Sequence, residues 1–137
     1  MSMIVGLGMD MASLSRIGKC LERFGAQFCR RILTEAEREL LPEAPAARTA
    51  FVAGRFAAKE AAVKALGTGF AEGIAPQDVE ILRLPSGRPE LRFYGAAARR
   101  AERLGVKSAH LSLTHEREIA GAVVVLEGKG AGLSRED

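Results

Sequence analysis

Hydrophobic residues in the first part of the chain follow two spacings in turn. The run at 3–9 is apolar apart from its glycines, and its length is typical of a buried strand. Alternation along a strand places Gly6, Gly8 and Asp10 on one face, which would leave the surface around that carboxylate without bulky side chains. Beyond this strand, apolar residues at helical spacing predict a helix over 14–24.

Residues that cap helices mark the next borders. Ser13 can accept a hydrogen bond from the first turn of that helix, and Gly25 can end it. Thr34, which acidic residues follow, predicts a second, short helix that Pro42 and Pro45 close.

The alanine-rich stretch at 49–66 is the strongest helix prediction in the sequence. Its residues fall into a bulky sector, a small sector and two polar ridges, one formed by Arg55 and Lys59 and the other by Glu60 and Lys64. A helix that merely lies on a surface has one apolar stripe and one polar face. We therefore expect this helix to be packed on two sides, with polar ridges that reach specific partners.

Strands dominate the second half of the chain, around one helix at 96–104. The predicted strands lie at 79–84, 90–93, 108–115 and 119–126. The last of them is continuously apolar, which predicts that both of its faces are covered. This order favours an α+β fold with a mainly antiparallel sheet packed with a long central helix. A single domain is expected over 1–127, with a mobile C-terminal tail at 128–137.

Composition narrows the class of protein. The chain has 137 residues, of which 47% are hydrophobic and 27% charged, as in one compact globular domain. It contains no apolar run of roughly 18 residues and no signal-peptide pattern, so a soluble cytoplasmic protein without membrane contact is expected. The net charge of +3 favours anionic partners. A nucleic-acid-binding module is disfavoured, because only 5% of residues are aromatic and none is Trp.

Asp10 is the first candidate for chemistry. An aspartate at the end of a strand often caps the next helix, and that interpretation stays open. A dinucleotide-binding loop is rejected because the glycine pair lacks its third glycine. A divalent cation between Asp10 and a phosphate explains the acid better, since the cation reverses the local charge.

Two further clusters carry groups suited to phosphate chemistry. Glu60 and Lys64 lie four residues apart on one helix face, either as a surface ion pair or as ligands of a cation and of phosphate oxygens. His115 ends the predicted strand at 108–115, where it is either a structural histidine or an imidazole that enters a cleft.

Together these clusters resemble the holo-acyl-carrier-protein synthases, which are small 4'-phosphopantetheinyl transferases. The segment at 54–69, GRFAAKEAAVKALGTG, is similar to the family's long central signature. GLGMD at 6–10, RILT at 31–34 and LSLTH at 111–115 resemble its other motifs, in the same order. The resemblance covers 3–127 and implies a 4'-phosphopantetheinyl transferase-like fold.

The resemblance also implies a reaction. Family members transfer 4'-phosphopantetheine from coenzyme A to a serine of an apo-acyl carrier protein, depend on Mg2+ and release adenosine 3',5'-bisphosphate, in support of fatty acid biosynthesis. Small members are homotrimers whose active sites are shared between neighbouring subunits, so a homotrimer is expected. A noncatalytic subunit that binds carrier proteins is the alternative, and the intact Asp10, Glu60 and Lys64 argue against it.

By the same resemblance, Asp10 and Glu60 would bind Mg2+, and Lys64 would neutralise charge that develops on phosphate. The base that activates the serine stays open between Glu60, His115 and a water held by the cation. The residues expected to contact coenzyme A are Arg55, Lys64, Gly67, Thr68 and His115.

A basic ridge on the helix at 14–24 is the candidate docking surface for the carrier protein. It consists of Arg16, Lys19 and Arg23. Carrier proteins of this system are typically acidic, so the charges are complementary. The ordinary alternative is a solvated helix face.

Overall fold

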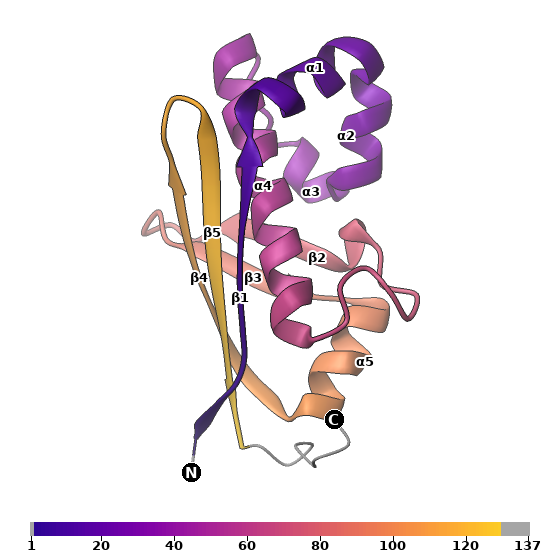
Figure 1. Ribbon diagram of the computed structural model, residues 1–137, viewed down its shortest axis with the longest axis vertical. Coiled ribbons are helices and arrows are strands. Elements are labelled where there is room, and N and C mark those ends of the chain that lie inside the picture. Colours follow the sequence, from indigo (N-terminus) through magenta and orange to yellow (C-terminus); the bar gives the residue numbers. More distant parts are fainter. Residues whose placement is uncertain (1, 130–137) are drawn as a thin grey trace.

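The molecule is built around one long helix. The computed structural model describes residues 2–129. Helix α4 (Pro45–Leu66) contacts strands of both antiparallel sheets, and Figure 1 shows the three-stranded sheet alongside it. The predicted α+β fold, with antiparallel sheets and a long central helix, is confirmed.

Two antiparallel sheets flank this helix. In the larger sheet, β5 (Ile119–Gly128) lies between β1 (Met3–Ser13) and β4 (Val106–His115). The smaller sheet is a hairpin of β2 (Val79–Arg83) and β3 (Pro89–Phe93). Because β1 and β4 occupy opposite edges of the larger sheet, groups at the two edges are separated by β5.

The shorter helices lie toward the two ends of α4 (Figure 1). Helices α1 (Leu14–Phe24), α2 (Ala26–Ile32) and α3 (Glu35–Arg38) gather toward its N-terminal end. The 3-10 helix η1 (Pro76–Asp78) precedes β2, and α5 (Gly95–Leu104) lies toward the other end of α4. In the part of the chain that the structure describes, no helix combines the length and the hydropathy that crossing a membrane requires.

The helix caps predicted from the sequence are present. The Ser13 hydroxyl accepts a hydrogen bond from the amide of Arg16 at 3.2 Å, which caps α1. Gly25 ends α1 with a φ of 49°, a conformation that suits glycine. Thr34 and Glu37 form a reciprocal capping box at the start of α3, where each side chain accepts the other residue's backbone amide.

Several predicted borders are wrong. The first strand continues to Ser13, and α4 begins at Pro45 instead of 49. Proline fits the first position of a helix because no amide is needed there, so Pro45 opens α4 and does not close the preceding helix. The short α2 was not predicted as a separate helix. Gly128, expected in the mobile tail, ends β5, and the rest of that tail at 130–137 lies outside the described residues.

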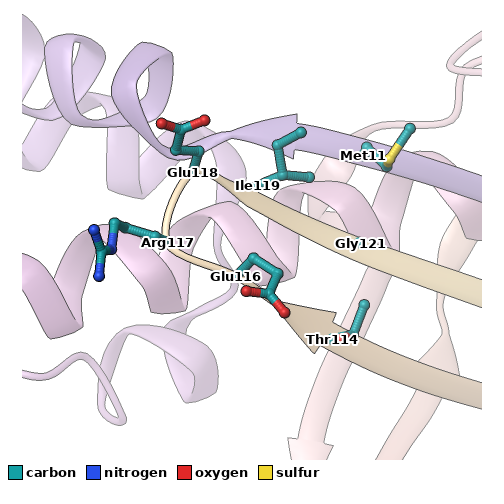
Figure 2. A pocket seen from close by; sticks show the side chains of 7 residues that line it. All are labelled: Met11, Thr114, Glu116, Arg117, Glu118, Ile119 and Gly121. Carbon is teal, nitrogen blue, oxygen red and sulfur yellow. The ribbon is translucent and has the colours of Figure 1, made fainter.

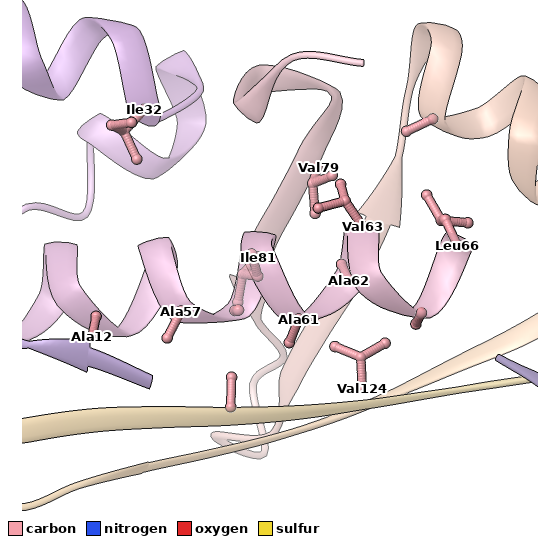
Figure 3. Close-up of a cluster of buried hydrophobic side chains, with 14 of the residues drawn as sticks. Ala12, Ile32, Ala57, Ala61, Ala62, Val63, Leu66, Val79, Ile81 and Val124 are labelled. Carbon is pink, nitrogen blue, oxygen red and sulfur yellow. The ribbon is translucent and has the colours of Figure 1, made fainter. Parts of the chain in front are cut away.

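The core forms where small residues of α4 meet both sheets, and Figure 3 shows side chains from these layers together. Alanines on α4 allow the strands to approach the helix closely, while larger side chains fill the remaining space. The labelled residues include Ala57, Ala61, Ala62, Val63 and Leu66 of α4, Val79 and Ile81 of β2, and Val124 of β5. The expected packing of α4 on two sides is thus confirmed.

The glycines of β1 serve a different purpose from the one expected. A Cβ atom at Gly8 would overlap the carbonyl oxygen of Ala61, and one at Gly6 would overlap that of Ala65. The glycine face beside Asp10 is therefore filled by the backbone of α4, and the interpretation of this face as bare surface is wrong. We call this contact of Gly6 and Gly8 with α4 the glycine seam.

Replacing Gly8 by alanine should therefore destabilise the protein. The new methyl group meets main chain that cannot rotate away, so we expect a loss of about 2–3 kcal/mol in the free energy of unfolding. Denaturant unfolding measures this change. The matched control is Gly54→Ala on α4, where a Cβ meets nothing within 4 Å in the described part of the chain. This control should raise the free energy of unfolding by about 0.5–1 kcal/mol. Equal effects of Gly8→Ala and Gly54→Ala would contradict the close contact at the glycine seam.

One polar ridge of α4 is anchored in a buried network. Lys59 and Glu37 are 1% and 0% exposed and pair at 2.8 Å. Lys59 also donates hydrogen bonds to the carbonyl oxygens of Pro76, at 3.0 Å, and Val79. Glu37 accepts the amide of Ile81 at 2.9 Å. Since burial lowers the pKa of Lys59 while Glu37 raises it, the carboxylate compensates part of the cost of burying the ammonium group.

The opposite face of the three-stranded sheet is apolar and open. Leu7, Met9 and Met11 of β1 are 67%, 62% and 63% exposed, although they lie beside the half-buried Val123 and Val125 of β5. The prediction that the last strand is covered on both faces is therefore wrong for the chain on its own. We call this surface the outer sheet face.

Candidate functional site

The first half of the candidate site lies where the end of β1 meets α4. The Lys64 ammonium group donates hydrogen bonds to Asp10 Oδ1 at 2.9 Å and to the Met9 carbonyl oxygen at 3.2 Å. The side chains of Lys64 and Asp10 are 51% and 23% exposed, so this pair can be reached from solvent. The second polar ridge of α4 thus reaches β1, and Lys64 forms its ion pair with Asp10.

Glu60 lies beside the same pair. Burial and the charge of Asp10 raise the pKa of Glu60, whereas Lys64 lowers it. Two carboxylates that repel one another at a solvent-accessible place are suited to a divalent cation, which removes the repulsion. Among residues 2–129 there is no cluster of three or more histidine, cysteine or acidic side chains able to hold a metal. A pair of acids fits Mg2+, which takes one or two carboxylates and completes its shell with water and phosphate oxygens.

The second half of the site is a cationic pocket of about 190 Å3 on α4. The Arg55 guanidinium group lies 4.0 Å from the centre of the Phe51 ring and donates a hydrogen bond to the Ile81 carbonyl oxygen at 3.3 Å. Its Nε atom is buried and has no hydrogen-bond partner among residues 2–129. Burial lowers the pKa of Arg55 to about 10, which still leaves it charged at neutral pH. The pocket is also lined by four residues of other elements, which are Arg83 of β2 and Leu113, Thr114 and His115 of β4.

The two halves lie on different sides of α4. At about 100° per residue, Arg55 and Lys64 point in opposite directions from the helix axis. Asp10 belongs to one edge strand of the larger sheet, and His115 ends the other edge strand. One chain therefore brings Asp10, Glu60 and Lys64 together, and separately Arg55 with His115.

Gly67 and Thr68 form the C-terminal cap of α4. The amide of Gly67 donates to the Lys64 carbonyl oxygen at 3.0 Å, and the amide of Thr68 donates to that of Val63 at 3.2 Å. The Thr68 hydroxyl donates to the carbonyl oxygen of Gly69 at 2.8 Å. The backbone amides of Gly67 and Thr68 and the Thr68 hydroxyl already have acceptors within the chain. Contact of these two residues with coenzyme A therefore stays a prediction.

The predicted docking ridge is exposed on α1. Arg16, Lys19 and Arg23 all face solvent. Between α1, β1 and α4 lies a groove of about 240 Å3, and a second cavity of about 260 Å3 adjoins it through Cys20 and Phe28. An apolar groove bordered by cations is suited to an amphipathic acidic partner.

A larger cavity, of about 480 Å3, lies elsewhere, at the end of the outer sheet face. Figure 2 shows Met11, Ile119 and Thr114 beside the hairpin that joins β4 and β5. None of the predicted site residues lines this cavity. We therefore assign it to the outer sheet face and not to the candidate site.

Two features of the site were not predicted from the sequence. Arg83 lines the cationic pocket, and Phe28 and Phe56 line the groove beside α1. Arg83 ends a strand without any motif around it, so no sequence signal marked it. The aromatic residues follow the helical apolar pattern that ordinary core residues also follow.

The chain is similar to known proteins along most of its length. Residues 6–124 match the model of the 4'-phosphopantetheinyl transferase superfamily. A holo-[acyl-carrier-protein] synthase of Maridesulfovibrio salexigens is 54% identical over 91% of this chain and 99% of its own length. The enzyme of the same name from Solidesulfovibrio magneticus is 57% identical over 92% of this chain and its full length.

Solved structures share the fold. The holo-[acyl-carrier-protein] synthase of Neisseria meningitidis superposes with a TM-score of 0.81 at 38% identity, covering 90% of this chain and 98% of its own. The holo-[acyl-carrier-protein] synthase of Helicobacter pylori, solved in complex with coenzyme A, gives a TM-score of 0.77 at 31% identity. The match covers 88% of this chain and 98% of that one. By sequence along nearly its whole length and by fold, the chain belongs to the holo-acyl-carrier-protein synthase family of the 4'-phosphopantetheinyl transferase superfamily.

Proposed function

We propose that this protein transfers the 4'-phosphopantetheine group of coenzyme A to a serine of an apo-acyl carrier protein, with Mg2+, in support of fatty acid biosynthesis in the cytoplasm. The observation that carries the proposal is the convergence of Asp10, Glu60 and Lys64 at the junction of β1 and α4. In the reaction, the serine hydroxyl gives its proton to a base and its oxygen bonds to the β-phosphorus of coenzyme A, while the bond between that phosphorus and the oxygen bridging to the α-phosphorus breaks. Adenosine 3',5'-bisphosphate leaves with that oxygen.

The residues present can supply this chemistry. Asp10 and Glu60 would hold Mg2+, which when bound neutralises pyrophosphate charge. Lys64, half-exposed and already placed at Asp10, can turn toward the phosphate and stabilise negative charge on the leaving group. Two protein groups are candidates for the base that activates the serine. Glu60 lies beside Asp10 and therefore near the proposed metal, whereas His115 lies in the cationic pocket on the other side of α4.

The cationic pocket supports a role in holding coenzyme A. Its buried Arg55 has an unpartnered Nε atom, and such a donor is costly to bury unless a ligand accepts its hydrogen bond. Coenzyme A carries two anionic groups, the pyrophosphate and the 3'-phosphate. With the pyrophosphate assigned to the metal pair, the 3'-phosphate is left for Arg55 and His115.

One chain cannot form both contacts around one coenzyme if α4 lies between them, so we propose a homotrimer with active sites between subunits. The outer sheet face supplies an apolar surface for this assembly, since Leu7, Met9 and Met11 are all more than half exposed. Another copy of the chain would bury this face and bring its cationic pocket beside the metal pair of its neighbour.

A charge on the outer sheet face should separate the subunits. We expect Met9→Glu to convert a trimer into monomers, because a carboxylate would be buried in the interface without a partner. Light scattering after size-exclusion chromatography measures the mass. The transferase activity should be lost together with the trimer. The control is Leu40→Glu, just after α3, where the side chain is 48% exposed; it should leave both the mass and the activity unchanged. A fully active Met9→Glu monomer would refute sites shared between subunits.

Transfer itself is tested by incubating the purified protein with coenzyme A, Mg2+ and an apo-acyl carrier protein. The intact mass of the carrier should increase by one phosphopantetheine group, and chelation of the metal should prevent the increase. If several competent carriers remain unmodified, the noncatalytic carrier-binding subunit becomes the better account.

Charge reversal on α1 tests the docking surface. We expect Arg16→Glu or Arg23→Glu to raise the carrier-protein KM by about tenfold and to weaken its dependence on salt, because exposed cations steer an acidic partner. The KM for coenzyme A should stay the same. Arg99→Glu on α5 is the matched control, since it makes the same charge change on an exposed residue of another helix. An unchanged KM for the carrier protein in the α1 variants would show that the carrier protein does not dock on α1.

A further inference from the structure

The backbone carbonyl groups at the C-terminal end of α4 each need a partner from outside the helix. The last four carbonyl groups of an α-helix have no donor within it, and in α4 the last of them belongs to Leu66. Those of Val63 and Lys64 accept amides of the loop that follows, at distances of 3.0 to 3.2 Å. That of Ala65 faces Gly6 across the glycine seam. The carbonyl group of Leu66 therefore depends on a donor from another part of the chain.

An arginine of α5 supplies this donor. Arg100 Nε donates a hydrogen bond to the Leu66 carbonyl oxygen at 2.9 Å, at a partly buried place. The Nη2 atom of Arg100 lies 3.4 Å from the position that a Cβ at Gly67 would occupy, so the guanidinium group packs against the cap of α4. A cation at the C-terminal end of a helix also complements the helix dipole. Arg100 thus closes the end of α4 with both a hydrogen bond and a charge.

The turn that Arg100 closes also carries Lys64. This lysine lies two residues before Leu66, and its ammonium group donates hydrogen bonds to Asp10 and to the Met9 carbonyl oxygen. Helix ends unwind readily where their carbonyl groups lack partners. Without its donor from α5, the last turn would therefore open more often, and the Lys64 ammonium group would move away from Asp10 with it.

A second arginine of α5 makes a contrasting contact. Arg103, three residues after Arg100, pairs at 3.5 Å with Glu72 in the loop that follows α4. Both side chains of this pair are more than half exposed, and such surface pairs contribute little to stability. Arg100 contacts α4 itself, whereas Arg103 contacts the loop. The two arginines have the same charge and lie on the same helix, which makes Arg103 a matched control.

We propose that Arg100 is a positioning residue for phosphopantetheine transfer, which closes the last turn of α4 and thereby holds the Lys64 ammonium group beside Asp10. This inference rests on the proposed function, in which Lys64 stabilises negative charge on the leaving group. Arg100 acts through the backbone of the turn and not by contact with the reacting groups. Its loss should therefore slow the chemical step and leave the binding of both substrates nearly unchanged.

Steady-state kinetics of Arg100→Met and Arg100→Gln tests this role. Methionine removes both the donor and the charge. The amide nitrogen of glutamine lies as many bonds from Cα as Nε of arginine does, so Arg100→Gln keeps a donor and removes the charge. Arg100→Met should lower kcat about tenfold, the usual effect of losing one charge-assisted hydrogen bond. The KM values for coenzyme A and for the carrier protein should stay the same, and Arg100→Gln should recover most of the lost kcat.

Hydrogen exchange measures the same turn directly. The amides of Thr68 and Gly69 donate to the Val63 carbonyl oxygen, so their protection reports whether the end of α4 is closed. Their exchange should become severalfold faster in Arg100→Met and return toward the parent rate in Arg100→Gln. Arg103→Met should change neither the exchange of these amides nor the kinetics of transfer.

The outcomes separate this inference from the proposed function. If the parent protein modifies carriers and Arg100→Met keeps the parent kcat, or Arg103→Met loses as much, the positioning role is wrong and the proposed function stands. A raised KM with an unchanged kcat would overturn the role as well, since it would place Arg100 in substrate binding. Equal losses in Arg100→Gln and Arg100→Met would show that the hydrogen bond to Leu66 does not matter. If the parent protein modifies no carrier, the proposed function fails and this inference fails with it.

Discussion

Asp10→Asn and Glu60→Gln are each expected to reduce phosphopantetheine transfer by about a thousandfold, the largest effect on activity that the structure predicts. Each change keeps the shape of the side chain and removes one of the two charges that would hold Mg2+. The loss should lie mainly in kcat at saturating coenzyme A, because the cation acts on charge that develops during the reaction. Steady-state kinetics over a range of Mg2+ concentrations measures both parameters.

A structural side effect can be distinguished from loss of the metal. Since burial and Asp10 raise the pKa of Glu60, its ionised form is unfavourable without a cation, and Glu60→Gln should leave the metal-free fold at least as stable as before. Mg2+ should raise the melting temperature of the parent protein and not that of the variant. Glu102→Gln, at an exposed acid on α5, should behave like the parent. A Glu60→Gln variant that transfers at more than a tenth of the parent rate would exclude Glu60 as a ligand.

Lys59→Met is expected to cost about 3–5 kcal/mol of folding free energy, enough to leave a small domain marginally stable. The change leaves Glu37 fully buried without its cation, and it removes the donor on which the carbonyl oxygens of Pro76 and Val79 depend. Denaturant unfolding at several protein concentrations measures the loss and accounts for any coupling to assembly.

The double variant Lys59→Met/Glu37→Leu makes this prediction specific. Removing both charges should recover part of the loss, so that the two changes are non-additive by about 1–3 kcal/mol. Recovery should be incomplete, because the Ile81 amide loses its acceptor as well. Arg103→Met breaks a surface pair with Glu72 in which both side chains are more than half exposed, and should cost under about 1 kcal/mol. Comparable losses for Lys59→Met and Arg103→Met would contradict the importance of burial.

Local sequence signals predicted the parts of the fold that depend on neighbours along the chain. Ser13 and Thr34 cap helices as expected, because a capping side chain acts on amides within three residues of itself. The long helix was predicted in type and in its end at Leu66 but not in its start. At Pro45 two meanings compete, since proline both interrupts a helix and fits its first position, and only the tertiary structure decides between them.

Contacts between distant segments were predicted less well. The glycines of β1 suggested open space, whereas the helix that fills this space lies more than fifty residues later. The ridge of Arg55 and Lys59 was identified as polar, but its acceptor Glu37 could not be named from spacing alone. Asp10, Glu60 and Lys64 were grouped through resemblance to a family; Lys64 pairs with Asp10 and the charges of both act on Glu60, while the roles of the three residues stay a prediction. Arg83 lies in no recognised motif, so only the folded chain reveals it.

The glycine seam also bears on which cations the site can distinguish. Asp10 lies two residues beyond Gly8, and Glu60 directly precedes Ala61, so the two acids flank a contact made by backbone atoms of both elements. A main-chain contact is stiffer than one between flexible side chains, and the separation of the backbone at Asp10 from that at Glu60 is therefore closely fixed. Mg2+ requires short, near-octahedral bonds, whereas Ca2+ accepts longer ones and more ligands. If Asp10 and Glu60 hold Mg2+ as proposed, the missing side chains of Gly6 and Gly8 would favour the smaller ion, because a larger ion would have to move β1 away from α4.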